Sequence, residues 1–192
     1  MIGFCTRALC GHAGKRSSVF RDFAECTLDE CAACRASIHQ RTGEIFELVM
    51  RDVEEAGFLK RLAAGIVVTG GAAGIGAAIV ERLRDEGTRV EIFDLKASPA
   101  VDITSYDAVR SAVERVGPVD ILVNNAGWDM FKPFLQTDPA FWQKIISINL
   151  IGAINLLHCV LPGMAAQGRG RAVNIASDAG RVGASRAAPY SA

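Results

Sequence analysis

A run of glycines between residues 69 and 76 has the spacing of a phosphate-binding turn. The run reads Thr69-Gly-Gly-Ala-Ala-Gly-Ile-Gly76 and joins an apolar stretch to a helical pattern. Amides in the first turn of a helix have no partner within the helix, and the helix dipole favours negative charge there. Glycine lets the backbone approach a phosphate because it has no Cβ. The alternative for a glycine cluster alone is an ordinary turn.

We therefore expect this turn to bind the pyrophosphate of a dinucleotide. The residues expected at the cofactor are Thr69, Gly70, Gly74, Ile75 and Gly76.

An acidic residue stands where the adenosine ribose of a dinucleotide would be held. Asp94 ends the second strand-like run, twenty positions after Gly74. A carboxylate there accepts hydrogen bonds from the ribose and repels a 2′-phosphate. The glycine turn contains no Arg or Lys. The pattern therefore favours NAD over NADP, the alternative for Asp94 being a solvated strand end. Asp102 fits either contact with the adenine edge or a cap of the following helix.

The elements that must position these residues alternate between strand and helix from Gly65 onward. Asp138 followed by Pro139 is typical of a helix start and predicts a long helix that continues through Leu161. Such alternation predicts an α/β fold with a Rossmann-type, doubly wound parallel sheet, whose ligand lies at the carboxyl ends of the strands. The predicted strands are 65–69, 89–94, a short one at 101–102, 120–124 and 171–176.

A second motif makes the resemblance to a known family specific. Asn124-Asn125-Ala126-Gly127 ends a predicted strand. Together with the glycine turn it resembles the short-chain dehydrogenase/reductase family, and residues 65 to 192 follow the order of that family's motifs over its first two thirds. The resemblance implies that Asn125, Ala126 and Gly127 lie at the cofactor. The stretches 117–134 and 174–183 are similar to 2-hydroxycyclohexanecarboxyl-CoA dehydrogenases and to 3-oxoacyl-ACP reductases.

The resemblance also assigns catalytic roles to three polar residues. Ser177 matches the hydroxyl that polarises the substrate carbonyl, and Tyr190, thirteen positions later, matches the proton donor or acceptor. Asn149 in the long helix matches the asparagine of a water relay. A phenol and a second hydrogen bond stabilise the negative charge that builds on a carbonyl oxygen during hydride transfer. Taken singly, the three also fit a turn serine, a surface tyrosine and a buried amide satisfied by backbone.

The family resemblance implies an NAD-dependent oxidoreductase that interconverts a secondary alcohol and a ketone. Its substrate is a small alcohol or ketone or an acyl thioester, and the full-length fold is expected to be a homo-oligomer that associates through the long helix and the helix that follows it. Two other hypotheses stay open. One is a non-catalytic dinucleotide-binding remnant or interaction protein, and the other is a metal-binding redox module at the start of the chain.

Residues 1–60 differ in composition from the NAD-binding domain at 61–192. They hold five of the six cysteines, and Cys26-x4-Cys31-x2-Cys34 has the spacing of three ligands of an iron–sulfur cluster. A fourth ligand at the required distance is missing, and zinc sites usually present two close pairs. We expect no metal site, and we interpret the segment as a poorly ordered Cys-rich extension or a mis-assigned start. A helical pattern at 44–56 stands out within it.

Charge and composition exclude two classes of partner. Lys and Arg total 21, as do Asp and Glu, so the zero net charge offers no attraction to nucleic acid or an anionic membrane. No run looks long and apolar enough to span a bilayer, and residues 1–20 lack the apolar block of a signal peptide. We therefore expect a cytoplasmic protein that binds small molecules, with no nucleic acid and no membrane partner.

In the family, a lysine follows the tyrosine by four positions. A free phenol keeps its proton at neutral pH and needs a nearby cation to act as acid and base. Position 194 lies beyond Ala192, so we expect a chain truncated after its fifth strand, with little or no turnover.

To test this, the chain of 192 residues is assayed beside a version extended through a lysine at position 194. We expect turnover from the extended chain only, because only there does a cation stand one helical turn after Tyr190. Equal activity in the two versions contradicts the idea.

Overall fold

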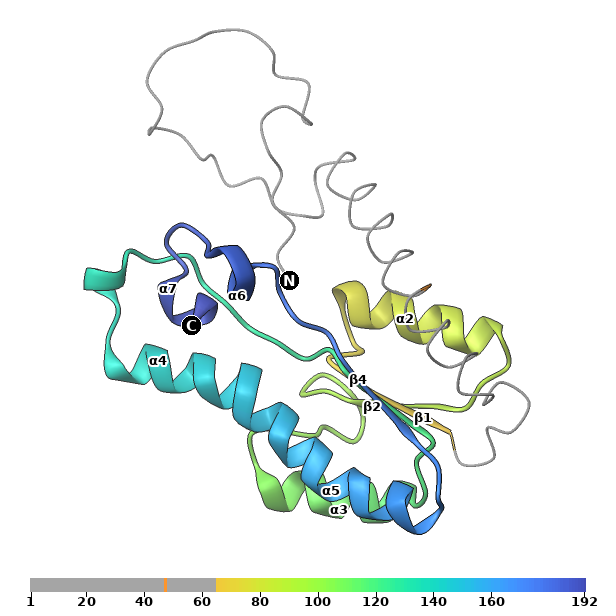
Figure 1. Ribbon diagram of the computed structural model, residues 1–192. Coiled ribbons are helices and arrows are strands. Elements are labelled where there is room, and N and C mark those ends of the chain that lie inside the picture. Colours follow the sequence, from red (N-terminus) through yellow and green to blue (C-terminus); the bar gives the residue numbers. More distant parts are fainter. Residues whose placement is uncertain (1–46, 48–64) are drawn as a thin grey trace, which may run out of the picture. The chain divides into compact units, whose positions relative to one another are not determined.

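The computed structural model describes residue 47 and residues 65–192 (Figure 1). The Cys-rich segment 1–60, its cysteine spacing and the helix predicted at 44–56 lie outside the described residues, apart from Glu47, which is helical. The description below concerns residues 65–192.

Four parallel strands form the sheet of this region: β1 (Ile66–Thr69), β2 (Val90–Phe93), β3 (Ile121–Asn124) and β4 (Arg171–Asn174). Their order is β2-β1-β3-β4, and each neighbouring pair is parallel. β1 and β3 are buried along their whole length, as expected for central strands of a sheet covered on both faces. The predicted doubly wound parallel sheet is confirmed.

The strand expected at Val101–Asp102 is wrong, so the described sheet has four strands rather than five. The Val101 N–H donates to the Asp94 carbonyl (3.0 Å), which closes the link from β2 into a compact loop. A crossover to another parallel strand needs a dozen or more residues. The link between Phe93 and Val101 is too short to provide one.

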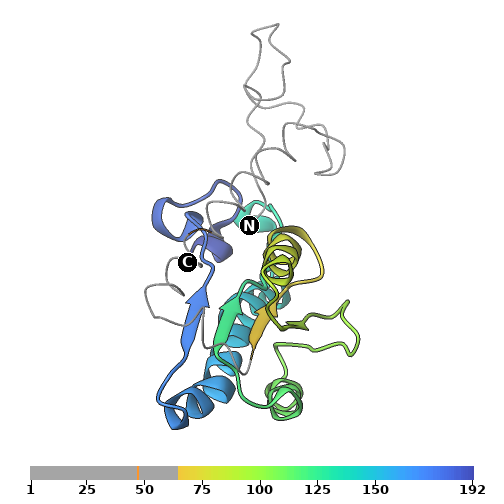
Figure 2. The same cartoon turned by 90° about the vertical axis from the view of Figure 1, so that its right-hand side faces the viewer.

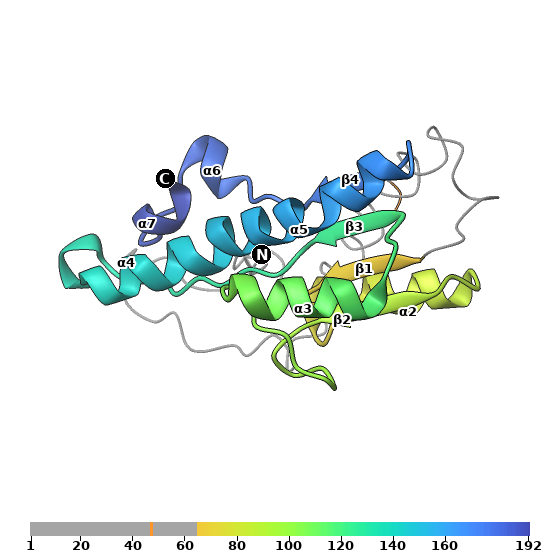
Figure 3. The ribbon, with the colours of Figure 1, turned by 90° about the horizontal axis from the view of Figure 1, so that it is seen from below.

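Helices cover both faces of the sheet (Figure 2). α2 (Gly74–Asp85) packs against β1 and β2, whereas α5 (Gly152–Ala166) packs against β3 and β4 and lies beside α3 (Tyr106–Val116), as Figure 3 shows from below. The core includes Leu122 of β3 and Leu156 of α5, both fully buried. Ser105 caps α3 by accepting the Ala108 N–H (3.3 Å).

The predicted long helix is continuous but not uniform. α4 (Pro139–Ile146) begins where the sequence predicts, since the Asp138 carboxylate accepts the Phe141 N–H (2.8 Å). A π-helical segment, η2 (Ser147–Ile151), joins α4 to α5, and there the Gly152 N–H bonds to the Ser147 carbonyl five residues back. The helix then ends at Ala166, beyond the expected Leu161.

This helix corrects the expectation that no run is apolar enough to span a bilayer. The 28 residues Pro139–Ala166 have an 18-residue window of mean hydropathy 1.8, which meets the requirement by length and composition. In the described residues, however, α5 packs on the sheet and on α3. A core helix of a soluble domain has the same composition as a membrane span, because both are apolar on most sides.

Candidate active site

The predicted site residues follow the carboxyl ends of three strands of the sheet. β1 leads into the glycine turn, β3 into Asn125–Gly127, and β4 into Ile175–Ser177. β1 and β3 are neighbours, but the chain leaves them toward helices on opposite faces. The crevice between two such strand ends is where open α/β sheets bind their ligands.

Hydrogen bonds fasten the glycine turn to the end of β3. The Thr69 hydroxyl accepts the N–H groups of Asn125 (3.0 Å) and Ala126 (2.9 Å). In return, the Asn125 side-chain amide donates to the carbonyls of Thr69 (3.1 Å) and Gly70 (3.3 Å). Thr69 is only 1% exposed, so it supports the site from beneath rather than lining its surface.

Two glycines are required by the closeness of these segments. A Cβ on Gly70 would lie 2.8 Å from Ala126 Cα, and one on Gly76 would collide with the Gly70 carbonyl and lie 2.5 Å from Asn125 Nδ2. Gly74 differs, because its φ is +59° and a Cβ there would meet no atom within 4 Å. Gly74 therefore borders open space, and its small size leaves room for a phosphate.

The beginning of α2 fits a pyrophosphate. Its N-cap, Ala73, makes no side-chain capping bond, and the first turn, which holds Ile75, contains no acidic residue. The amides at this end thus have no anion from the helix itself, while the dipole favours one.

Asp94 is held in place by backbone amides on both sides. Its Oδ2 accepts the Ala72 N–H (3.2 Å) from the glycine turn, and its Oδ1 accepts the Lys96 N–H (2.8 Å). These contacts orient the carboxylate beside the turn, where ribose hydroxyls are bound in dinucleotide sites. Asp102 acts locally, since its Oδ1 accepts both the N–H (2.9 Å) and the hydroxyl (2.7 Å) of Thr104.

Five predicted cofactor residues line one cavity of about 550 Å³, here called the Asp94 cavity: Gly70, Asp94, Asp102, Ala126 and Gly127. Its wall also includes Trp128 and Lys144, which the cofactor prediction missed. Lys144 Nζ lies 3.9 Å from the centre of the Trp128 ring, a cation–π contact. The available signal was helical spacing, because Lys144 shares a face of the helix with Ser147 and Ile148 of the same wall.

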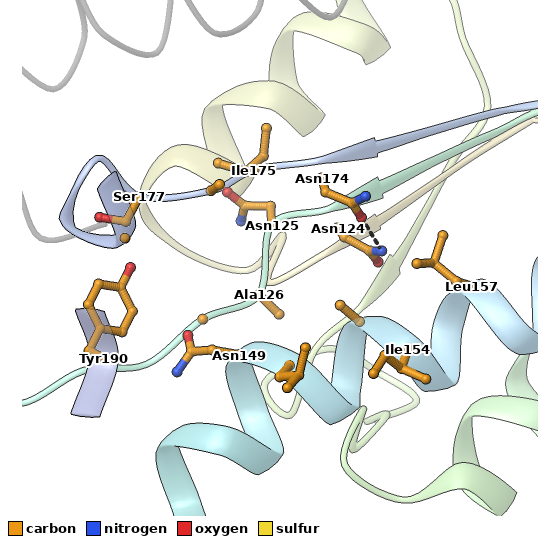
Figure 4. Close-up of a pocket in the computed structure, with 15 residues that line it drawn as sticks. Asn124, Asn125, Ala126, Asn149, Ile154, Leu157, Asn174, Ile175, Ser177 and Tyr190 are labelled. Atoms are coloured by element: carbon orange, nitrogen blue, oxygen red, sulfur yellow. Dashed lines mark hydrogen bonds between the residues drawn. The ribbon is translucent and has the colours of Figure 1, made fainter. Parts of the chain in front are cut away.

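A second cavity, of about 420 Å³, brings the three predicted catalytic residues together (Figure 4). We call it the Tyr190 cavity. Ala126 and Gly127 line both cavities, so the two adjoin at this dipeptide. The Tyr190 cavity is lined by Ser177, Tyr190, Asn149, Asn125, Ala126, Gly127 and apolar residues of α5.

The Tyr190 hydroxyl points toward the segment that carries Ser177, and both residues line this cavity (Figure 4). Tyr190 belongs to the short helix α7 (Ala188–Ser191), and Ser177 precedes α6 (Ala179–Val182). The Ser177 Oγ accepts the Ala179 N–H (3.2 Å), which leaves its own proton available to a ligand. Both residues are partly exposed. The two hydroxyl donors therefore line the same cavity.

The Asn149 side chain forms hydrogen bonds with backbone groups. Its Oδ1 accepts the Trp128 N–H (3.0 Å), and its Nδ2 donates to the carbonyls of Trp128 (2.7 Å) and Ile145 (2.9 Å). Asn149 lies in η2, where the π-helical pattern changes the partners of nearby carbonyls. The side chain thus holds the segment after Gly127 against the long helix.

One buried acceptor in the Tyr190 cavity has no partner among the described residues. Asn124 is 6% exposed, and its Nδ2 donates to Asn174 Oδ1 (2.8 Å) across β3 and β4. Its Oδ1 makes no hydrogen bond. Buried carbonyl oxygens are usually paired, so this atom is available to a donor within the cavity.

Neither metal nor thiol chemistry gains support from residues 65–192. This part of the chain holds no group of three His, Cys, Asp or Glu side chains arranged for a metal ion. Cys159 is its one cysteine, and burial raises the pKa of that thiol. A raised thiol pKa disfavours the nucleophilic thiolate.

Comparison with known proteins gives consistent matches. The sequence model of the family described as short chain dehydrogenase matches residues 64–192. The acetoacetyl-CoA reductase of Rhizobium meliloti (strain 1021) is 38% identical over 144 residues, which cover 66% of this chain and 60% of that protein. The 2,3-dihydroxy-2,3-dihydro-p-cumate dehydrogenase of Pseudomonas putida is 38% identical over 149 residues, covering 66% and 58%. The chain thus spans about 60% of the length of these relatives.

Solved structures resemble the fold to a similar extent. The ligand-free aldohexose dehydrogenase of Thermoplasma acidophilum superposes with a TM-score of 0.61 at 28% identity, covering 66% of this chain and 54% of that one. The serine dehydrogenase of Escherichia coli gives a TM-score of 0.61 at 25% identity, covering 66% and 68%.

The Thr69 hydroxyl can be tested by a pair of variants. Thr69→Val keeps the side-chain shape but removes the acceptor of two partly buried N–H groups, so we expect the free energy of unfolding to fall by about 2 kcal/mol. Thr69→Ser keeps the hydroxyl and should lose less. Urea unfolding followed by circular dichroism measures both. A larger loss in Thr69→Ser than in Thr69→Val would show that the methyl group, not the hydroxyl, stabilises the junction.

Proposed function

The chain belongs to the short-chain dehydrogenase family, and on that premise we propose that it serves NAD-dependent interconversion of a secondary alcohol and a ketone. The observation that carries the proposal is the meeting of the two cavities at Ala126–Gly127. One contains Asp94 and the other contains Ser177 and Tyr190. A molecule extended along both would have its ribose end at Asp94 and its reactive end beside the two hydroxyls.

The residues that would hold the cofactor are those of the glycine turn and Asp94. The first-turn amides of α2 would bind the pyrophosphate, and Gly74 leaves it room. Asp94, already oriented by two amides, would accept hydrogen bonds from the ribose and repel a 2′-phosphate. This supports NAD rather than NADP as the cofactor.

The protein's part in the chemistry is to manage a proton and a developing charge. When bound, NADH supplies the hydride that reduces the carbonyl carbon, and NAD⁺ accepts it in the reverse direction. In reduction, the Tyr190 hydroxyl gives its proton to the carbonyl oxygen, while the Ser177 O–H donates a hydrogen bond to the same oxygen. In oxidation, the Tyr190 oxygen takes the alcohol proton. Asn149 holds the Trp128 backbone and so fixes the segment that borders both cavities.

We propose a small alcohol or ketone as the substrate, including a hydroxyacyl thioester. The name of the 38% identical acetoacetyl-CoA reductase supports an acyl thioester. The apolar residues Ile154 and Leu157 in the Tyr190 cavity are compatible with an acyl chain. The proposal includes a cytoplasmic location.

Asp94 provides the test of cofactor and function together. Asp94→Ala should weaken NAD⁺ binding by about 10- to 100-fold, because charge-assisted hydrogen bonds to the ribose are lost. NADP⁺ binding should weaken less, because the repulsion of the 2′-phosphate is lost as well. Isothermal titration calorimetry with each dinucleotide measures both effects, and Asp85→Ala, an exposed carboxylate at the end of α2, is the matched control.

The outcomes separate two failures. If the unmodified protein binds neither dinucleotide, the proposed function is wrong. If Asp94→Ala binds NAD⁺ as tightly as the unmodified protein, only the role of Asp94 is wrong.

We also propose that two copies associate through the long helix. Its exposed apolar side chains support this, since large apolar patches on soluble domains mark interfaces. Those outside the Tyr190 cavity are Ile146, Ile151 and Leu161. Leu161→Glu should shift the protein toward monomer in sedimentation velocity, because it places a charge in the interface. Leu135→Glu, 95% exposed in η1 (Phe134–Gln136), should not. A monomeric unmodified protein would refute the association.

A further inference from the structure

Arg186 adopts a backbone conformation that side chains disfavour. Its φ is +63°, and it is the one non-glycine residue between 65 and 192 with a positive φ. In this region the Cβ crowds the backbone, most severely when the Cβ is branched. Such residues persist when their surroundings hold them, and they cluster at functional sites. Arg186 lies four positions before Tyr190.

A hydrogen bond from a distant segment holds Arg186 in this conformation. The Lys132 N–H donates to the Arg186 carbonyl at 2.8 Å. Lys132 lies in the loop that leaves β3 through Gly127 and Trp128 and leads to α4. This bond therefore ties the segment bordering both cavities to the segment that carries Tyr190.

Hydrogen bonds link the residues from Ala184 to Ser191 to one another, on both sides of Arg186. Ala187 is 1% exposed, and its carbonyl accepts the N–H groups of Tyr190 (3.1 Å) and Ser191 (3.0 Å). The Ser191 hydroxyl also donates to that carbonyl (3.0 Å) and accepts the Ala184 N–H (3.1 Å). A single helical turn is not stable on its own. The direction of α7 thus depends on how the chain enters Ala187.

We infer that Arg186 is a positioning residue for Tyr190, acting through its backbone. Its left-handed conformation, fixed by the Lys132 N–H, turns the chain so that the Tyr190 hydroxyl faces Ser177. The Arg186 side chain is exposed and plays no part in this role. The inference rests on the proposed function, in which Tyr190 transfers the proton.

Three substitutions at this position separate backbone from side chain. Arg186→Gly relieves the crowding and keeps the carbonyl that Lys132 binds. Arg186→Ala keeps an unbranched Cβ but removes the guanidinium. Arg186→Val places a branched Cβ in the left-handed region, which disfavours the native φ. Lys132→Ala serves as a control, because it removes a side chain but leaves the donating N–H in place.

The readout uses the small number of tyrosines. The chain contains two, Tyr106 and Tyr190, so a protein labelled with ¹³C at the tyrosine ring gives two signals, which Tyr106→Phe assigns. We expect NAD⁺ to shift the Tyr190 signal in the unmodified protein and in the Gly, Ala and Lys132→Ala variants. In Arg186→Val the Tyr190 signal should move before NAD⁺ is added and lose its response, while the Tyr106 signal stays unchanged.

Steady-state kinetics give a second readout, measured on the version extended through a lysine at position 194. In that version Arg186→Val should lower kcat by about 100-fold, as a misplaced catalytic group does, with KM for NAD⁺ unchanged. Arg186→Gly should retain kcat. If Arg186→Val does not fold, Ser191→Ala replaces it, because the Ser191 hydroxyl links Ala184 to Ala187, and the same displacement of the Tyr190 signal is expected.

Each contrary result has a distinct meaning. If NAD⁺ leaves the Tyr190 signal of the unmodified protein unchanged although calorimetry detects binding, Tyr190 does not adjoin the bound cofactor and the inference fails. If Arg186→Val, or Ser191→Ala in its place, behaves like the unmodified protein, the positioning role is refuted. If the Tyr190 signal of both Arg186→Ala and Arg186→Gly fails to respond to NAD⁺, the guanidinium positions Tyr190 and the backbone role is refuted. Absence of any dinucleotide binding refutes the proposed function before this question arises.

Discussion

The hydrogen bonds between Thr69 and the Asn125–Ala126 backbone join the ends of two strands whose chains then turn to opposite faces of the sheet. Without such a connection the crevice between β1 and β3 would have no defined width, because each strand end continues into a loop. The Thr69 hydroxyl and the Asn125 amide bind four backbone groups near this crevice. The glycine turn and the segment after β3 are therefore placed by one shared set of bonds.

Other contacts extend this junction outward. Asp94 reaches the glycine turn through the Ala72 N–H, and Asn149 grips the Trp128 backbone from the long helix. Lys132 continues the same segment to Arg186 and hence to α7. The polar side chains that follow these strands thus mostly bind backbone groups of neighbouring loops. Two cavities with different linings can then share the Ala126–Gly127 dipeptide.

Much of the fold could be predicted from the sequence, because local patterns determine it. The β-branched runs predicted β1 to β4, and Asp138 followed by Pro139 predicted the start of the long helix. Ser177, Tyr190 and Asn149, which the family resemblance singled out, line one cavity, and their catalytic roles stay a prediction. The strand at Val101–Asp102 was wrong because alternation of elements was extended over a link too short for a crossover.

The remaining features depend on contacts that a single sequence does not reveal. Lys144 pairs with Trp128 only because the loop after Gly127 returns to the helix. Thr69 reads as a cofactor residue in the motif, yet burial shows that its hydroxyl serves the backbone. The left-handed φ of Arg186 could not be anticipated, because arginine carries no preference for it. The π-helical segment could not be predicted, because the apolar residues around 147–151 fit an α-helical and a π-helical period equally well.

That segment, η2, places a constraint on chain length rather than on side-chain chemistry. A residue added to or taken from an α-helix rotates everything beyond it by about 100°. The wide turn of η2 already holds one residue more than an α turn. A further residue inserted within 147–151 would leave the composition of the helix nearly unaltered, yet it would swing the inward residues of α5, such as Leu156 and Val160, away from the strands they cover. This stretch should therefore accept exchanges of one apolar residue for another far more readily than it accepts insertions.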